Sequence, residues 1–219
     1  FSLCCWEETT NETLFAECRR WAALHAEPAY PSIRPVAVER SPERPLRLGW
    51  CSADFRSHPV GRNVVAMFER LDRNAFASVI YGDLKLPDPI TERFREAAQD
   101  WRDIQSTSDA EAAEMVRADR IDILVMVAGH TLRNRLGVAA YKPAPVQISF
   151  HDLLTTGLSV MDGWITDPVL HPESTPERFT EKLIRLPNFY LHEPPAGASE
   201  LDPPPPSTSS GVTFGSMNN

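Results

Sequence analysis

The chain has 219 residues, of which 42% are hydrophobic and 24% charged, and its net charge of −8 is that of an acidic globular protein. No run of lysines and arginines is present, which argues against nucleic acid as a partner. The longest apolar stretch, IDILVMVAG, is too short to span a membrane. The four cysteines form no CxxC pair, so they predict neither a zinc site nor disulfides, and reduced thiols fit a cytoplasmic protein.

The N-terminal part predicts one helix followed by a linker. The first residues, FSLCCWEETT, lack a methionine, a basic flank and a cleavage pattern, so we expect a cut through a longer chain. Thr9 and Glu12 predict a capping box that opens a helix, and Leu14, Cys18 and Trp21 form its apolar stripe. This stripe should dock on the following domain or on repeats that precede it. Five prolines in residues 27–45 predict an extended linker.

From residue 46 onward, apolar runs alternate with helical patterns. Strands are expected over residues 46–51, 76–82, 101–104, 121–127, 146–150, 163–166 and 182–186. Helices are expected over 61–71, from Asp88 and Pro89, from a capping box of Ser108 and Glu111 to about 118, and over 131–141. This alternation predicts βαβ units in an α/β, Rossmann-like doubly wound parallel sheet. Residues 194–211 predict a Pro/Ser-rich linker, and residues 212–219 begin a further strand.

Polar residues follow several of the expected strands at one edge of the sheet. In a strand order 3-2-1-4-5, the first and fourth strands are neighbours, and ligands bind at their carboxyl ends. The loops after the first, fourth and fifth strands carry His58, His130 and His151, three of the six histidines. A histidine in a turn is often merely solvated; Asp54 is equally compatible with a turn cap, and Gly129 with a plain turn glycine. Neither a G-x-G-x-x-G nor a Walker motif is present.

Several segments then carry a family resemblance. LRLGWCSADFRSHPVGRNV, IDILVMVAGHTLRNRLGVAAYKPAPVQISF, TTGLSVMDGWITD and EKLIRLPNFYL together resemble the catalytic region of the protein O-GlcNAc transferase / SPINDLY family. The segment LFAECRRWAALHA resembles the helix that joins that family's tetratricopeptide repeats to its catalytic part, which assigns residues 1–26 to this joining region. VTFGSMNN resembles the first strand of the family's C-terminal lobe.

The resemblance implies a GT-B glycosyltransferase, with two Rossmann-like lobes facing each other across a cleft. Residues 46–193 would be the N-terminal catalytic lobe, and residues 212–219 the start of a truncated C-terminal lobe. Members transfer a sugar from a nucleotide donor to Ser or Thr hydroxyls of proteins, with inversion and without a catalytic metal. UDP-N-acetylglucosamine is the usual donor, and some SPINDLY-type members use GDP-fucose. The expected partners are therefore a nucleotide sugar and a protein or peptide acceptor, with no cofactor, nucleic acid or membrane.

The resemblance also implies roles for individual residues. His58 matches a histidine at the reaction centre, and His130 matches the loop that faces the donor sugar and the acceptor. A neutral imidazole is a suitable acceptor for the proton of an attacking hydroxyl. The predicted substrate-binding residues lie beside these two or in the family's GTTG turn: Pro59, Gly129, Thr131, Thr155, Thr156 and Gly157. The groups that bind the leaving diphosphate are expected in the missing lobe.

Two departures from the family pattern keep alternatives open. The family usually reads W-x-G-Y-P-G-T-T-G where this chain has SFHDLLTTG, so His151, Leu153 and Leu154 replace glycines and a proline. Met126 replaces the acid of the family's DLxGHT. Side chains at former glycines could crowd the sugar. A non-catalytic scaffold lobe and a fucosyl-transferring enzyme therefore remain as alternatives. A free-standing flavodoxin-like binding domain is a third alternative, which requires natural termini and is disfavoured by the missing methionine.

Overall fold

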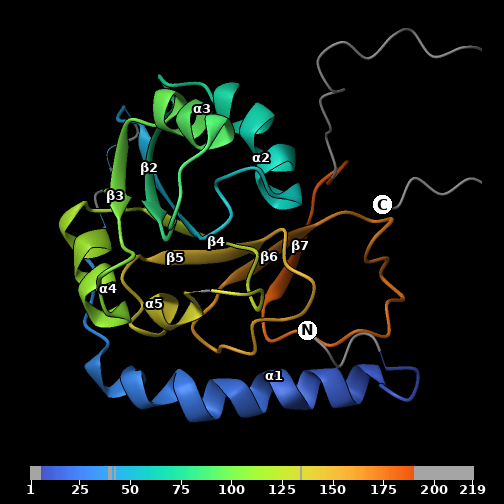
Figure 1. The fold of residues 1–219 in the computed structure, drawn as a ribbon. Helices are drawn as coiled ribbons and strands as arrows, with labels where there is room; N and C mark the ends of the chain where they lie inside the picture. Colours follow the sequence, from blue (N-terminus) through green and yellow to red (C-terminus); the bar gives the residue numbers. More distant parts are fainter. Residues whose placement is uncertain (1–5, 39–40, 42, 134, 190–219) are drawn as a thin grey trace, which may run out of the picture.

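The computed structural model describes residues 6–38, 41, 43–133 and 135–189 (Figure 1). These residues form a seven-stranded sheet in the order β3-β2-β1-β4-β5-β6-β7, in which every pair of neighbours is parallel. The strands are β1 (Leu46–Ser52), β2 (Phe76–Gly82), β3 (Asp100–Asp103), β4 (Ile123–Val127), β5 (Val146–Phe150), β6 (Gly163–Thr166) and β7 (Lys182–Arg185). The helices are α1 (Asn11–His25), the 3-10 helix η2 (Glu27–Ser32), α2 (Pro59–Glu69), α3 (Pro89–Ala97), α4 (Asp109–Ala118) and α5 (Leu136–Ala140).

The predicted fold class is confirmed, because β1 pairs with both β2 and β4. Trp50 in β1 lies opposite Ile80 of β2 and Val125 of β4. The chain therefore changes direction across the sheet between β3 and β4. The edge that lies beyond the carboxyl ends of β1 and β4 is the position at which doubly wound sheets bind ligands.

Helices cover both faces of the sheet, which explains its largely apolar strands. Helices α2 and α3 pack on one face, over buried Trp50, Ile80 and Val125. Helices α4, α5 and α1 pack on the other face, over buried Tyr81 and Leu124 (Figure 1). A parallel strand that is buried on both faces reads as a continuous apolar run, as β4 does.

Side-chain caps start several helices where the sequence predicts them. Asp88 and Ser108 each form a capping box at the first turn of α3 and α4. The cap predicted at Thr9 is wrong by one residue: Thr10 holds the extended backbone of a cap, and its Oγ1 accepts a hydrogen bond from the Thr13 N–H at 3.2 Å. A side-chain oxygen reaches the amide three residues on, so the pair that fits is Thr10 with Thr13.

Two further predictions need correction. The helix expected over 131–141 is confined to α5, because Arg133 adopts a left-handed φ of 65° that interrupts a helix. The linker predicted as extended over 27–45 begins with η2, which has proline at its first turn, where the missing N–H costs no hydrogen bond. The predicted linker at 194–211 and strand at 212–219 lie outside the described residues.

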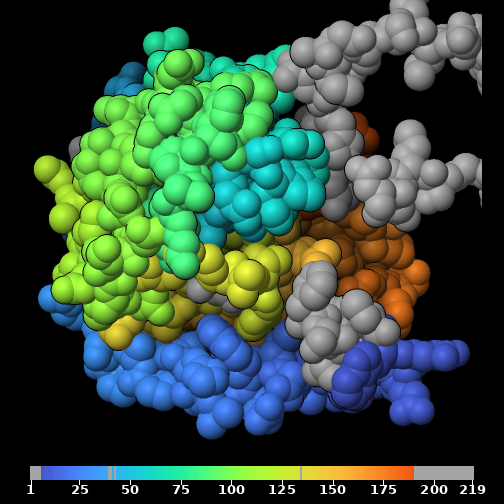
Figure 2. All heavy atoms as spheres, in the orientation of Figure 1, coloured from blue at the N-terminus to red at the C-terminus, as the bar shows by residue number. Residues whose placement is uncertain are grey.

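Helix α1 docks on the lobe, along the base of the molecule in Figure 2. Cys18 and Ala22 are buried, and Ala22 belongs to the same apolar cluster as α4 and α5. Near the N-terminal end of α1, Glu12 accepts a hydrogen bond from Arg178 at 2.5 Å. Of the apolar stripe predicted for this helix, Cys18 is buried and Leu14 and Trp21 are partly buried against the α/β domain. Within the described part of the chain, no helix has the length and apolar character needed to cross a bilayer.

Candidate functional site

A cavity of about 370 Å³ lies at the carboxyl ends of β1, β2 and β4. Because β1 has β2 and β4 as its neighbours, the loops that follow these three strands converge there. Its polar lining comprises Asp54, Arg56 and His58 from the first loop, Asp83 and Lys85 from the second, and Thr131 and Arg133 from the third. Among the described residues, no group of three or more histidines, cysteines and carboxylates is placed to hold a metal ion.

His58 lies on this cavity because it caps helix α2. Its backbone is extended, Pro59 occupies the first helical position, and the ring Nδ1 accepts a hydrogen bond from the Val60 N–H at 3.3 Å. A nitrogen that accepts cannot carry a proton, so the neutral ring in this arrangement is protonated on Nε2. The ring remains partly exposed at the cavity wall. His58 therefore has both a structural role and access to a ligand.

Asp54 is placed to support a second tautomer of the same ring. Its carboxylate is buried, with Oδ1 3.6 Å from His58 Nδ1 and 3.7 Å from the Arg56 guanidinium. When Nδ1 carries the proton, Asp54 is the nearest acceptor and Nε2 gains a free lone pair. A base that acts through Nε2 needs this tautomer, and a carboxylate behind the ring stabilises the imidazolium that results.

His130 has different surroundings, although Thr131 beside it lines the cavity. The His130 Nε2 lies 3.0 Å from the Thr156 carbonyl oxygen, so it carries a proton and donates it there. The ring packs edge-on against Trp21 of α1, with centroids 5.0 Å apart. Burial lowers the pKa of His130, which keeps the ring neutral at pH 7. Its remaining lone pair is on Nδ1.

The predicted Thr155-Thr156-Gly157 turn is held by a buried carboxylate. Glu181 accepts hydrogen bonds from the Thr155 hydroxyl at 2.6 Å, from the Thr156 N–H at 2.8 Å and from the Thr156 hydroxyl. Gly157 has a φ of +75°, and a Cβ there would lie 2.4 Å from the Cys18 carbonyl oxygen of α1. Both threonine side chains are therefore engaged within the lobe, and glycine is required for α1 to approach.

Gly129 and Asp152 join the loops after β4 and β5. Gly129 has a φ of +27°, and a Cβ on it would fall 1.2 Å from the Asp152 carboxylate. Asp152 Oδ1 accepts a hydrogen bond from the Leu153 N–H at 2.8 Å. Burial, only partly offset by the backbone N–H donors of Leu153, His130 and Leu154, raises the pKa of Asp152 to about 7. The glycine thus allows a carboxyl group to fill the space between the two loops.

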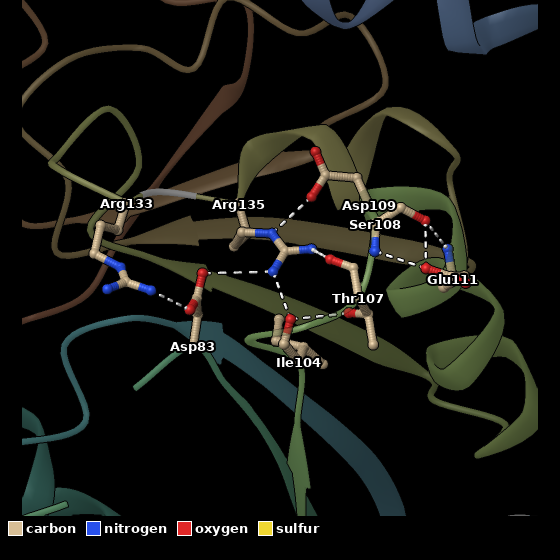
Figure 3. Close-up of polar contacts among 8 residues, drawn as sticks. All are labelled: Asp83, Ile104, Thr107, Ser108, Asp109, Glu111, Arg133 and Arg135. Carbon is tan, nitrogen blue, oxygen red and sulfur yellow. Dashed lines mark hydrogen bonds and ion pairs between the residues drawn. The ribbon is translucent and has the colours of Figure 1, made fainter. Parts of the chain in front are cut away.

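Sequence reasoning missed a network of charges beside the cavity (Figure 3). Asp83 follows β2 and is buried between two arginines: Arg133 Nη2 lies 2.7 Å from its Oδ1, and Arg135 Nη1 lies 3.4 Å from its Oδ2. Arg135 also binds Asp109 at 2.7 Å and the carbonyl oxygens of Ile104 and Thr107. The position of Asp83 after β2, next to β1, was the signal that could have revealed it.

The residues that depart from the resembled motif take up specific structural roles. His151 stands where the motif has glycine, and it adopts a left-handed φ of 55°, which is strained for a side chain with a Cβ. Its ring packs against Phe150 and Phe189, with centroids 4.6 Å and 4.8 Å away. Met126 is buried in β4. Aromatic packing therefore holds the loop where the motif would rely on glycine.

Comparison with known proteins relates the whole lobe to one group of enzymes. The model of "Glycosyl transferase family 41" matches residues 20–193. Two proteins called "Probable UDP-N-acetylglucosamine--peptide N-acetylglucosaminyltransferase SPINDLY" are similar over 97% of this chain. The protein from Solanum lycopersicum is 34% identical over 218 residues, and that from Arabidopsis thaliana is 36% identical over 222 residues. These alignments cover 23% and 24% of the two proteins, so the chain spans about a quarter of their length.

A solved structure agrees with this relationship. A mutant O-GlcNAc transferase from Thermobaculum terrenum superimposes with a TM-score of 0.81 at 36% sequence identity. The match covers 87% of this chain and 37% of that one. Sequence similarity and structural similarity thus each extend over most of the chain. The chain belongs to glycosyl transferase family 41.

Proposed function

We propose that this chain is the N-terminal catalytic lobe of a longer protein O-glycosyltransferase of the cytoplasm. The enzyme would transfer N-acetylglucosamine from UDP-N-acetylglucosamine to Ser or Thr hydroxyls of a polypeptide, with inversion and without a catalytic metal. Support comes from membership of family 41 and from relatives named as UDP-N-acetylglucosamine–peptide transferases. The second lobe and the joining role of residues 1–26 are part of this proposal.

The observation that carries the proposal is the position of His58. It lies on the cavity at the switch point of the sheet, with Asp54 3.6 Å behind its Nδ1. In the proposed step, Nε2 takes the proton of the acceptor hydroxyl while that oxygen attacks the anomeric carbon. The bond from the anomeric carbon to the diphosphate oxygen breaks on the opposite face, and the electron pair leaves with the diphosphate. Asp54 stabilises the resulting imidazolium.

The predicted loop residues would contribute backbone and shape to the sugar site. His130, Gly129 and Thr131 fix the loop after β4, and the turn of Thr155, Thr156 and Gly157 is held by Glu181. With both threonine hydroxyls engaged, we propose that this turn presents its main chain to the donor. Pro59 would act by presetting the start of helix α2 beneath His58.

A transfer assay with the full-length protein tests the function. The protein would be incubated with a Ser/Thr-rich peptide and either UDP-N-acetylglucosamine or GDP-fucose, and the product identified by mass spectrometry. Addition of N-acetylglucosamine that is lost in His58→Ala supports the proposal. Addition of fucose instead would identify a fucosyl-transferring enzyme.

A non-catalytic scaffold is the second candidate, and the strained backbone of His151 favours it. A left-handed histidine stands in the loop expected to face the sugar, and Leu153 beside it is exposed. Full-length protein that is folded but transfers neither sugar would support this candidate and contradict the first.

The isolated 219-residue chain should be inactive under this proposal. One lobe cannot by itself exclude water, orient the acceptor against the anomeric carbon and stabilise a leaving diphosphate. Calorimetric titration with UDP-N-acetylglucosamine should show weak binding or none, and a radiolabel assay should detect no transfer. Micromolar binding with turnover would contradict the proposed division between two lobes.

A further inference from the structure

The cavity beside His58 carries more positive charge than its place in an acidic chain would suggest. Arg56, Lys85 and Arg133 all line it, while the whole chain has a net charge of −8. Two carboxylates line it as well, and both have cationic neighbours. Asp83 is 2.7 Å from Arg133, and Asp54 is 3.7 Å from Arg56. Three cations against two carboxylates leave one positive charge in excess.

Lys85 supplies this excess charge. It is an exposed residue in the loop after β2, and within the described part of the chain it makes no hydrogen bond or ion pair. Arg133, by contrast, is fixed by Asp83, and the Arg56 Nε donates to the Ala53 carbonyl oxygen at 3.3 Å. An uncompensated ammonium in a concave site concentrates anions there.

The rim of the same cavity is apolar. Leu86 and Leu132 both line it and are 80% and 88% exposed. They flank the cationic groups, because Leu86 follows Lys85 and Leu132 precedes Arg133 in the chain. A ligand that fits this surface combines an anionic group with apolar groups beside it.

We propose that the cavity binds an aspartate or glutamate side chain of the acceptor polypeptide, close in sequence to the accepting Ser or Thr. The inference rests on the proposed function and adds a specificity determinant to it. Lys85 pairs with the carboxylate, and Leu86 and Leu132 contact an apolar neighbour of the acidic residue. Since His58 lines the same cavity, the acidic residue lies within a few positions of the hydroxyl that reacts.

The donor's diphosphate fits this cavity less well. Because Arg56 and Arg133 offset Asp54 and Asp83, one positive charge remains, which matches a single carboxylate more closely than a diphosphate with two or more negative charges. A volume of about 370 Å³ is near the lower end for small-molecule sites, and it suits one or two side chains. Exposed leucines are also suited to a polypeptide.

Paired peptides test the inference with the full-length protein. A series of Ser/Thr-rich peptides would carry one glutamate at successive positions, each with a twin in which glutamine replaces it. We expect kcat/KM to favour the glutamate peptide about threefold at the best position, as one exposed ion pair allows. Lys85→Glu should abolish or invert this ratio. Lys182→Glu, the same change of charge on β7 outside the cavity, should leave the ratio unchanged.

A binding measurement separates this inference from the proposed function. Fluorescence anisotropy of the labelled glutamate peptide, without donor, should show weaker binding by the Lys85→Glu variant and weaker binding at high salt. If no sugar is transferred but this Lys85-dependent binding persists, the proposed function fails, and of the inference only the binding of an acidic peptide side chain in the cavity stands. Equal kcat/KM for both peptides of every pair overturns the inference. If Lys85→Glu raises the KM for the donor equally with both peptides of a pair, the inference is also overturned, because Lys85 would then bind the phosphate of the donor.

Discussion

The two histidines predicted for the reaction centre lie at one edge of the sheet, but their surroundings are opposite. His58 faces the open cavity, caps a helix with one ring nitrogen and has Asp54 near it. His130 is packed under α1, with its Nε2 on the Thr156 carbonyl oxygen and its ring against Trp21. The ring of His58 lines the cavity and can gain a free lone pair on Nε2, whereas the ring of His130 contacts helix α1 and the turn at Thr156.

Neighbouring residues of the loop after β4 contact two different parts of the molecule, the cavity and helix α1. Thr131 lines the cavity, whereas His130 contacts α1. In Figure 2 the yellow segment after β4 lies between the cyan start of α2 and the blue helix α1. A single loop therefore contacts α1 and also forms part of the cavity wall. We expect substitution of His58 to lower the rate of sugar transfer, and substitutions around His130 to lower mainly the stability of the fold.

The largest effect is expected for His58→Asn in the full-length protein. Asparagine is a good helix cap, so it retains an acceptor for the Val60 N–H but removes the imidazole. Transfer should fall by about 10² to 10⁴, the usual contribution of a general base. The measurement is kcat/KM with a peptide acceptor, alongside the melting temperature.

The matched variant His58→Ala removes the cap as well as the base. It should lose the same activity and about 1 kcal/mol of stability. Near-normal transfer by His58→Asn would show that capping, and not chemistry, explains this histidine.

The next effect is a loss of stability in Glu181→Ala. Glu181 is buried and accepts hydrogen bonds from Thr155 and Thr156, so its removal leaves a buried N–H and two hydroxyls without their acceptor. A cost of about 2–3 kcal/mol in the free energy of unfolding is expected. Urea denaturation would measure it.

Glu173→Ala is the control for that variant. Glu173 lies in the same segment but is exposed, so its removal should change stability by less than about 0.5 kcal/mol. Equal unfolding midpoints for the Glu181 and Glu173 variants would mean that the buried carboxylate does not hold the turn.

Local patterns in the sequence were sufficient for most of the sheet. The strands over 76–82, 146–150 and 163–166 have the predicted bounds, and the caps at Asp88 and Ser108 are where short-range chemistry places them. Apolar runs and caps depend on residues within one turn or strand, which a single sequence displays directly.

Contacts between distant segments were not predictable in the same way. Glu181 reaches Thr156 across 25 residues, and Arg135 reaches Asp83 across 52. Neither pair has a spacing that marks it, because the sheet and not the local chain brings the partners together. The sequence placed both histidines on the ligand edge, but the burial of His130 depends on how α1 docks.

A smaller effect is expected for His130→Ala. The variant loses an edge-on aromatic contact with Trp21 and the hydrogen bond to Thr156, together worth about 1–2 kcal/mol. Transfer by the full-length protein should fall less than in His58→Asn, because the loop is loosened and the base is retained. Melting temperature and kcat/KM would be measured on the same preparations. Loss of transfer as large as in His58→Asn, with an unchanged melting temperature, would place both histidines in the chemistry.

The last expected effect concerns how stability depends on pH around His130, in the loops after β4 and β5. Burial raises the pKa of Asp152 to about 7 from its usual value near 3.8. Between these values the folded chain retains a proton that the unfolded chain releases, so stability falls as the pH rises from about 4 to 7. His130 acts in the opposite sense, because its lowered pKa makes stability fall as the pH drops below about 6.5.

Asp152→Asn isolates the carboxyl contribution from that of the histidine. Asparagine keeps an oxygen for the Leu153 N–H but cannot ionise, so the variant should retain the His130 effect alone. Urea midpoints would be measured for both proteins at pH 5 and pH 8. From pH 5 to pH 8, the midpoint of the parent protein should fall relative to that of Asp152→Asn. If the two proteins show the same difference between pH 5 and pH 8, then Asp152 is ionised in the folded chain throughout. In that case the backbone donors around Asp152 outweigh its burial, and the surroundings of His58 and His130 differ less than the packing indicates.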